Sequence, residues 1–103
     1  MNNLQIGKMY LVKEYFWLLF PTKEVVEPWR AADGDAFRAA YRAAKWYSER
    51  YNCNIDVVEP NTCFVLLEHD EKYFKLLDSN GNVGWIYYYD FSNFSNYFEL
   101  VKE

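Results

Sequence analysis

The chain has 103 residues, of which 51% are hydrophobic, 21% aromatic and 25% charged, and its net charge at pH 7 is −4. This length fits a single domain, and the apolar content excludes a disordered tail. The acidic balance disfavours general binding to nucleic acid, because phosphates repel an acidic surface.

The N-terminal residues MNNLQIGK contain no long apolar segment, and the longest apolar run, residues 15–20, is too short to cross a bilayer. We therefore expect a cytoplasmic protein with no membrane contact.

Residues 8–20, KMYLVKEYFWLLF, predict one long, bent strand. Alternation places these side chains on one face: Tyr10, Val12, Phe16, Leu18 and Phe20. Pro21 ends the strand, because proline cannot donate to a ladder. Residues 21–32 are predicted to be a connection, which Val25, Val26 and Trp29 could pin to the core.

Residues 33–51 change to a helical period and predict an amphipathic α-helix. Asp33 or Asp35 can cap its start, and Asn52 can close its end. The expected buried face comprises Phe37, Tyr41, Ala44, Tyr47 and Tyr51. A second stripe is charged and comprises Arg38, Arg42, Lys45 and Glu49. That stripe is either a solvated face or a contact with acidic groups, on a partner or in the C-terminal half of the chain.

Cys53 and Cys63 lie ten residues apart without CxxC spacing, and His69 is the only histidine, so no metal site is predicted. The cysteines are expected to be small half-buried hydrophobic residues, with a disulfide as the alternative. His69 is expected in a solvated loop. No nucleophile motif and no phosphate-binding glycine loop occurs, so we expect neither an enzyme nor a cofactor.

Residues 55–86 contain apolar runs separated only by polar turns, which is typical of an antiparallel meander. Asn80-Gly81 favours a hairpin turn. The predicted strands are residues 63–68, 73–78 and 83–88, with a closing strand at 98–101.

The sequence VGWI at residues 83–86 resembles the Gly-aromatic-Ile segment in the fourth strand of many SH3 domains. PNTCFVLLE at residues 60–68 resembles the approach to their second strand. The resemblance implies one SH3-like domain over residues 1–103. Its fold would be mainly β, a five-stranded antiparallel barrel with one α-helix, about residues 33–51, inserted after the first strand.

The chain departs from SH3 domains that bind proline-rich peptides. It lacks an ALYDY-type motif, has Tyr73-Phe74 near their Trp position, and has Tyr87 in place of their Pro. The proline-peptide function therefore does not carry over. The whole chain also resembles small uncharacterised proteins encoded by cyanobacterial phages, a resemblance that implies no activity.

The best candidate for surface recognition is the aromatic tract at residues 85–98. Period two places Trp85, Tyr87 and Tyr89 on one side of a strand and Ile86 on the inward side. The outward rings either pack under the helix or meet a partner.

Two functions follow from this tract. The first is a protein-binding module that uses Trp85, Tyr87 and Tyr89 with the basic stripe Arg38, Arg42 and Lys45. Its partner would be a host protein in the host cytoplasm if the chain is phage-encoded. The alternative is a structural or assembly protein that forms homo-oligomers through exposed aromatic side chains.

Overall fold

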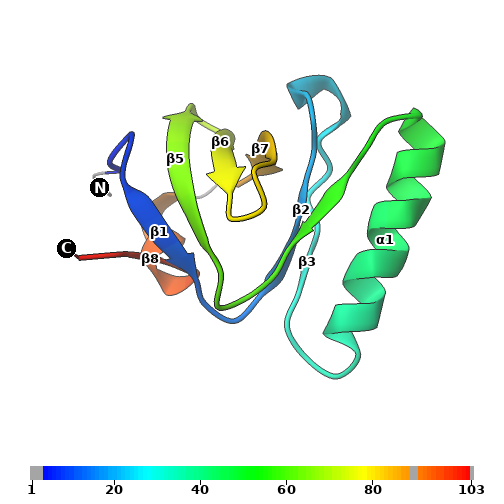
Figure 1. Ribbon diagram of the computed structural model, residues 1–103, viewed down its shortest axis with the longest axis horizontal. Helices are drawn as coiled ribbons and strands as arrows, with labels where there is room; N and C mark the ends of the chain where they lie inside the picture. Colours follow the sequence, from blue (N-terminus) through cyan, green and yellow to red (C-terminus); the bar gives the residue numbers. More distant parts are fainter. Residues whose placement is uncertain (1–3, 89–90, 103) are drawn as a thin grey trace.

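The computed structural model describes residues 4–88 and 91–102, and over these residues it is mainly β, with two antiparallel sheets and one α-helix (Figure 1). The five-stranded sheet has the order β7-β6-β5-β1-β8, and the three-stranded sheet has the order β3-β2-β4. Neither sheet closes into a barrel. The strands are β1 (Met9–Val12), β2 (Phe16–Leu19), β3 (Arg30–Ala31), β4 (Asp56–Val58), β5 (Cys63–His69), β6 (Tyr73–Asp78), β7 (Val83–Tyr87) and β8 (Phe98–Leu100). The helices are α1 (Ala36–Tyr51) and the 3-10 segments η1 (Lys23–Val25) and η2 (Phe91–Asn96).

Every end of the meander strands β5, β6 and β7 lies within one residue of its predicted position. Gly81 has φ 87°, a conformation that glycine adopts without steric cost. The Asp78 carboxylate accepts hydrogen bonds from the backbone N–H groups of Asn80 and Asn82, which fixes the turn. The predicted hairpin at Asn80-Gly81 is confirmed.

The predicted long strand at residues 8–20 is two strands in different sheets, β1 and β2. The predicted single face is wrong beyond Val12, because the bend between the strands changes which residues point inward. Trp17 and Leu19 join the main core with Tyr10 and Val12. Leu18 and Phe20 instead face a second core beside α1. Both faces of β2 are thus buried, which explains why FWLLF has no polar position.

Strands β3 and β4 were not predicted. β2 pairs with β3 through Trp17 and Arg30, and with β4 through Trp17 and Val58. The two sheets meet where an isolated bridge joins Phe20 to Trp85 of β7.

Two cores lie on opposite sides of β2. The main core lies between one face of the five-stranded sheet and strand β2. It is rich in phenylalanine and includes Phe64, Phe74, Phe94 and Phe98. The second core contains Leu18, Phe20, Ala44 and Ile55, against which Val25, Val26 and Trp29 pack. Residues 21–32 are therefore pinned to the protein, as predicted.

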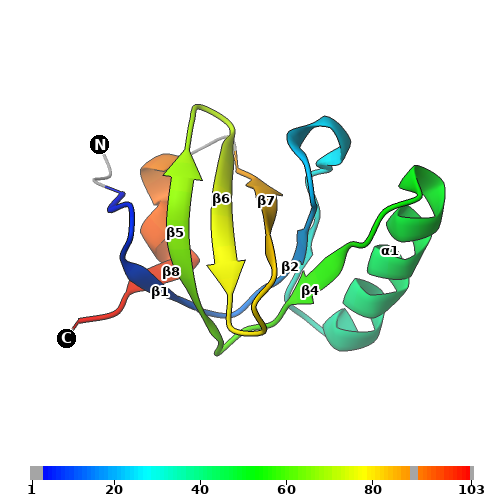
Figure 2. The same ribbon diagram turned by 45° about the horizontal axis from the view of Figure 1, so that its top comes forward.

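Helix α1 packs on β2, β3 and β4, on the side away from the five-stranded sheet (Figure 2). It ends as predicted at Asn52, which is left-handed and donates its backbone N–H to the carbonyl oxygen of Ser48. The predicted buried face is right for Ala44, which is buried, and for Tyr47, which packs against the second core. It is wrong for Phe37 and Tyr41, which are 58% and 45% exposed. The fully buried helix residues are Ala36, Ala40 and Ala44. Small side chains let the helix axis approach the strands closely, so the rings lie at the edge of the contact.

Candidate recognition surface

Two neighbouring hollows share one wall, the side chain of Trp29. The first hollow, about 320 Å³, is lined by Trp17, Pro28, Trp29, Arg30, Tyr87, Tyr88 and Asn93. The second hollow, about 350 Å³, is lined by Trp29, Ala39, Arg42, Ala43, Trp46 and Tyr47. We call the two linings together the Trp29 surface.

Local sequence explains why Trp29 stands between the hollows. Pro28 fixes its own φ just before β3, and the pairing of β3 with β2 sets Arg30 opposite Trp17. On the other side, Trp29 packs against the second core and thereby meets α1. On the far wall of the first hollow, the Tyr88 hydroxyl donates a hydrogen bond to Asn93 of η2.

Arg30 is an exposed cation held among aromatic rings. Its guanidinium carbon lies 4.6 Å from the ring centroid of Tyr97, 5.3 Å from that of Tyr15 and 5.7 Å from that of Trp17. Within the described ranges, its side chain forms neither an ion pair nor a hydrogen bond with another side chain. Because ring stacking does not use the in-plane N–H groups of a guanidinium, these donors can still bind an acceptor.

Trp17 is only 2% exposed, and its indole nitrogen has no hydrogen-bond acceptor among the residues that the structure describes. A buried donor without an acceptor costs about 1–3 kcal/mol. Such a group in a native protein needs a specific explanation, and an acceptor supplied from outside the chain is one.

Two of the predicted site residues come together here. Tyr87 lines the first hollow and Arg42 the second. Arg38 and Lys45 are exposed on the same helix but line neither hollow. None of the three basic residues forms an ion pair with a carboxylate of the described chain, so the alternative in which the stripe pairs with the acidic half is not seen there. Tyr89, the remaining member of the predicted aromatic set, lies outside the described residues.

Trp85 lies apart from the Trp29 surface, although Ile86 faces the core and Trp85 faces outward as predicted. The Lys23 ammonium lies 4.6 Å from the Trp85 ring centroid, and that of Lys75 lies 5.7 Å from it. The ring is thus covered by η1 and β6 side chains.

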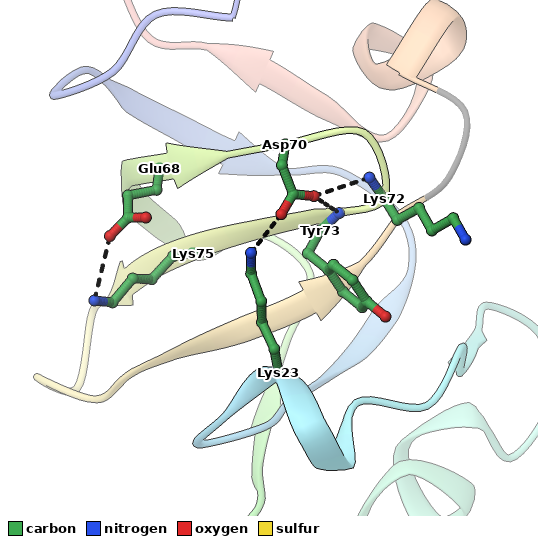
Figure 3. Close-up of polar contacts among 6 residues, drawn as sticks. All are labelled: Lys23, Glu68, Asp70, Lys72, Tyr73 and Lys75. Atoms are coloured by element: carbon green, nitrogen blue, oxygen red, sulfur yellow. Dashed lines mark hydrogen bonds and ion pairs between the residues drawn. The ribbon is translucent and has the colours of Figure 1, made fainter.

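An ion pair holds the Lys23 side chain in place (Figure 3). Lys23 Nζ lies 2.5 Å from the Asp70 carboxylate, which also accepts the backbone N–H groups of Lys72 and Tyr73. Partial burial of the Asp70 carboxyl opposes its ionisation, but these hydrogen bonds outweigh burial and lower its pKa to about 2.

Tyr41, beside the basic stripe, donates its hydroxyl to Glu59 at the end of β4. That hydrogen bond, together with partial burial, raises the pKa of Tyr41 to about 12. The contact ties the exposed face of α1 to the three-stranded sheet.

Both cysteines are free thiols and half-buried, and burial raises the pKa of the Cys53 thiol. His69 is exposed at the end of β5. The described part of the chain has no cluster of three or more His, Cys, Asp or Glu side chains that could hold a metal ion. Nor does any described helix have the length and apolar character needed to span a bilayer.

Sequence reasoning missed Trp17 and Arg30 as site residues and gave Trp29 only a packing role. One available signal was the triplet Pro28-Trp29-Arg30, which places a cation beside an aromatic ring in a segment without helical or strand periodicity.

Comparison with protein-family models, with curated proteins and with solved structures finds no match in any of the three. A functional proposal must therefore start from the geometry of the Trp29 surface.

Proposed function

We propose that this protein is a small, non-enzymatic protein-interaction module that binds a segment of a partner protein on the Trp29 surface. One observation carries the proposal: half of the described residues that line the two adjacent hollows are aromatic, and the only charged residues among them are Arg30 and Arg42. Tryptophan, tyrosine and arginine are the residue types that dominate binding energy at protein interfaces.

Charge indicates the chemistry of the partner. Arg30 and Arg42 border the two hollows, and Arg38 and Lys45 extend the positive charge along the exposed face of α1. Opposite charges on the two partners speed association and exclude like-charged competitors. The segment bound there carries apolar side chains next to carboxylates.

The proposal includes an SH3-like architecture. The meander β5 to β7, the neighbouring β1, and the short β8 that follows η2 have the connectivity expected of that fold and support this assignment. If the chain is phage-encoded, the proposed partner is a host protein and the proposed place of action is the host cytoplasm. Tyr87 replaces the proline of peptide-binding SH3 domains, so we propose no polyproline ligand.

Selection from a displayed library of random peptides tests the proposal. Peptides selected on the wild-type protein should bind Trp29→Leu at least about tenfold more weakly, because Trp29 walls both hollows. Trp85→Leu is the matched control, since Trp85 is also a half-buried tryptophan but lines neither hollow. A library that yields no binder, or binders weakened only by Trp85→Leu, contradicts the proposal.

A second function is favoured by exposed rings on α1: Trp46 is 54% exposed, and Phe37 and Tyr41, whose rings contact each other, are 58% and 45% exposed. Such exposed rings could join copies of the chain in a structural or assembly protein. Light scattering separates the two functions: a defined oligomer that dissociates in Phe37→Ser favours assembly, and a monomer favours the module.

A further inference from the structure

We propose that the first hollow binds an apolar carboxylate, with its carboxylate group held by Arg30 and the indole N–H of Trp17. This inference rests on the proposed function and deepens it, because it names the chemistry that a partner presents to one half of the Trp29 surface.

Arg30 supplies the charge. Its guanidinium makes cation–π contacts with the rings of Tyr97, Tyr15 and Trp17. These contacts position the cation at the hollow before any ligand binds. No carboxylate is among the described residues that line the hollow. A fixed guanidinium forms stronger hydrogen bonds with a carboxylate than with a neutral acceptor, because the pair is charge-assisted.

Trp17 supplies the second donor. Its side chain lines the same hollow, and its indole N–H lacks an acceptor within the described chain. The Arg30 guanidinium carbon lies 5.7 Å from the Trp17 ring centroid, so the cation stands beside this ring, and the carboxylate is proposed to lie between the guanidinium and the indole N–H. One oxygen accepts from each donor, and the anion satisfies a group that the fold leaves without an acceptor.

The walls of the hollow indicate the size and polarity of the part of the ligand next to the carboxylate. Pro28, Trp29 and Tyr87 present apolar and aromatic surface, and the hollow measures about 320 Å³. That volume is near the lower end of the range for ligand pockets, about 300–1,000 Å³, so the apolar body is compact. A carboxylate beside one apolar side chain occurs in the C-terminal residue of a polypeptide, and also in a free aryl or alkyl acid.

Titrations of the wild-type protein with three probes test the inference and separate these sources. The probes are acetyl-Gly-Gly-Phe with a free carboxylate, the same peptide as its C-terminal amide, and phenylacetate. The free acid should bind at least about tenfold more tightly than the amide, because the amide cannot form the charge-assisted pair. It should also shift the Trp17 indole signal in a ¹H–¹⁵N spectrum. Tighter binding of the peptide than of phenylacetate assigns the ligand to a chain terminus, and the reverse order assigns it to a small acid.

Arg30→Met keeps a flexible apolar side chain against the rings and should remove the preference for the acid. Arg50→Met is the matched control, because Arg50 also stacks on two aromatic rings, Trp46 and Tyr51, but lines neither hollow. Equal binding of acid and amide, an unmoved Trp17 signal, or an unchanged preference in Arg30→Met would overturn the inference.

The comparison of acid with amide uses the wild-type protein, so it decides the question even if Arg30→Met fails to fold. If library peptides bind the Trp29 surface but acid and amide bind alike, the result supports the interaction module and contradicts the carboxylate site. If neither library peptides nor probes bind, both proposals fall.

Discussion

Gly84 packs directly against the backbone of Phe20, at the place where β7 meets the end of β2. A Cβ atom built on Gly84 would lie 2.6 Å from the Phe20 carbonyl oxygen and 2.7 Å from Leu19 Cγ. Two backbone hydrogen bonds, of 2.9 and 2.7 Å, join Phe20 and Trp85 beside it. The junction between the two sheets therefore requires a residue without a side chain.

Gly84→Ala should lower the free energy of unfolding by about 1–3 kcal/mol, because a methyl group forces the strands apart at this junction. Urea denaturation measures the change. Val83→Ala, at the exposed neighbouring position of the same strand, is the control and should have little effect. Equal midpoints for wild type and Gly84→Ala would show that the sheets do not meet as described.

Substitution of the buried alanines of α1 should lower the free energy of unfolding more than substitution of its exposed aromatic residues. Ala40 is fully buried, so Ala40→Leu should cost about 1–3 kcal/mol through overpacking. Phe37→Ala should cost about 1 kcal/mol or less, since the ring is largely exposed and packs against the rings of Phe16 and Tyr41 at the edge of the contact. A lower denaturant midpoint for Phe37→Ala than for Ala40→Leu would show that the aromatic face of the helix is buried instead.

The ion pair between Asp70 and Lys23 should make stability depend on acid pH. The pKa of Asp70 is lowered in the folded state from its ordinary value of 3.8 to about 2. The resulting stabilisation is fully present above the unfolded pKa and is lost as the pH falls through the folded value. Asp70→Asn should therefore have a lower urea midpoint at pH 7, and the difference should shrink toward about pH 2. A difference that stays constant with pH would remove Asp70 as its cause.

Charge reversal at the two arginines of the basic stripe should have similar effects on stability but different effects on peptide binding. Arg38 and Arg42 are both exposed and form no ion pair within the described chain, so either change to Glu should alter stability by less than about 0.5 kcal/mol. Arg42→Glu should weaken binding of the selected peptides and reduce its salt dependence more than Arg38→Glu, because only Arg42 lines a hollow. Equal losses would indicate general attraction to the helix rather than a site.

The meander could be predicted because its strands are long enough to show period two and its turns contain Asp, Asn and Gly. Strands β3 and β4 could not, because segments of two and three residues carry no period and form only by pairing with β2. The helix was predicted, but its buried face was predicted only in part, since Ala44 and Tyr47 pack inward and Phe37 and Tyr41 do not. Aromatic rings dominate the apolar pattern of α1, whereas close approach to the strands selects alanine.

Some residues of the candidate site could likewise be predicted from the sequence, and others could not. Tyr87 and Arg42 could be chosen from composition, since both belong to segments rich in aromatic or basic side chains. Trp17 and Arg30 could not, because their proximity depends on the register between β2 and β3. Trp29 was expected to pin its segment to the core, and it does pack against the second core. Only the structure shows that it also lines both hollows.

The four tryptophans provide the most direct test of the Trp29 surface. Trp17, Trp29 and Trp46 line its hollows, and Trp85 lies outside it under Lys23. A selected peptide added to ¹⁵N-labelled protein should shift the indole N–H signal of Trp29, together with that of Trp17 or Trp46, and leave that of Trp85 in place. A shift of the Trp85 signal with the Trp29 signal unmoved would contradict recognition at this surface.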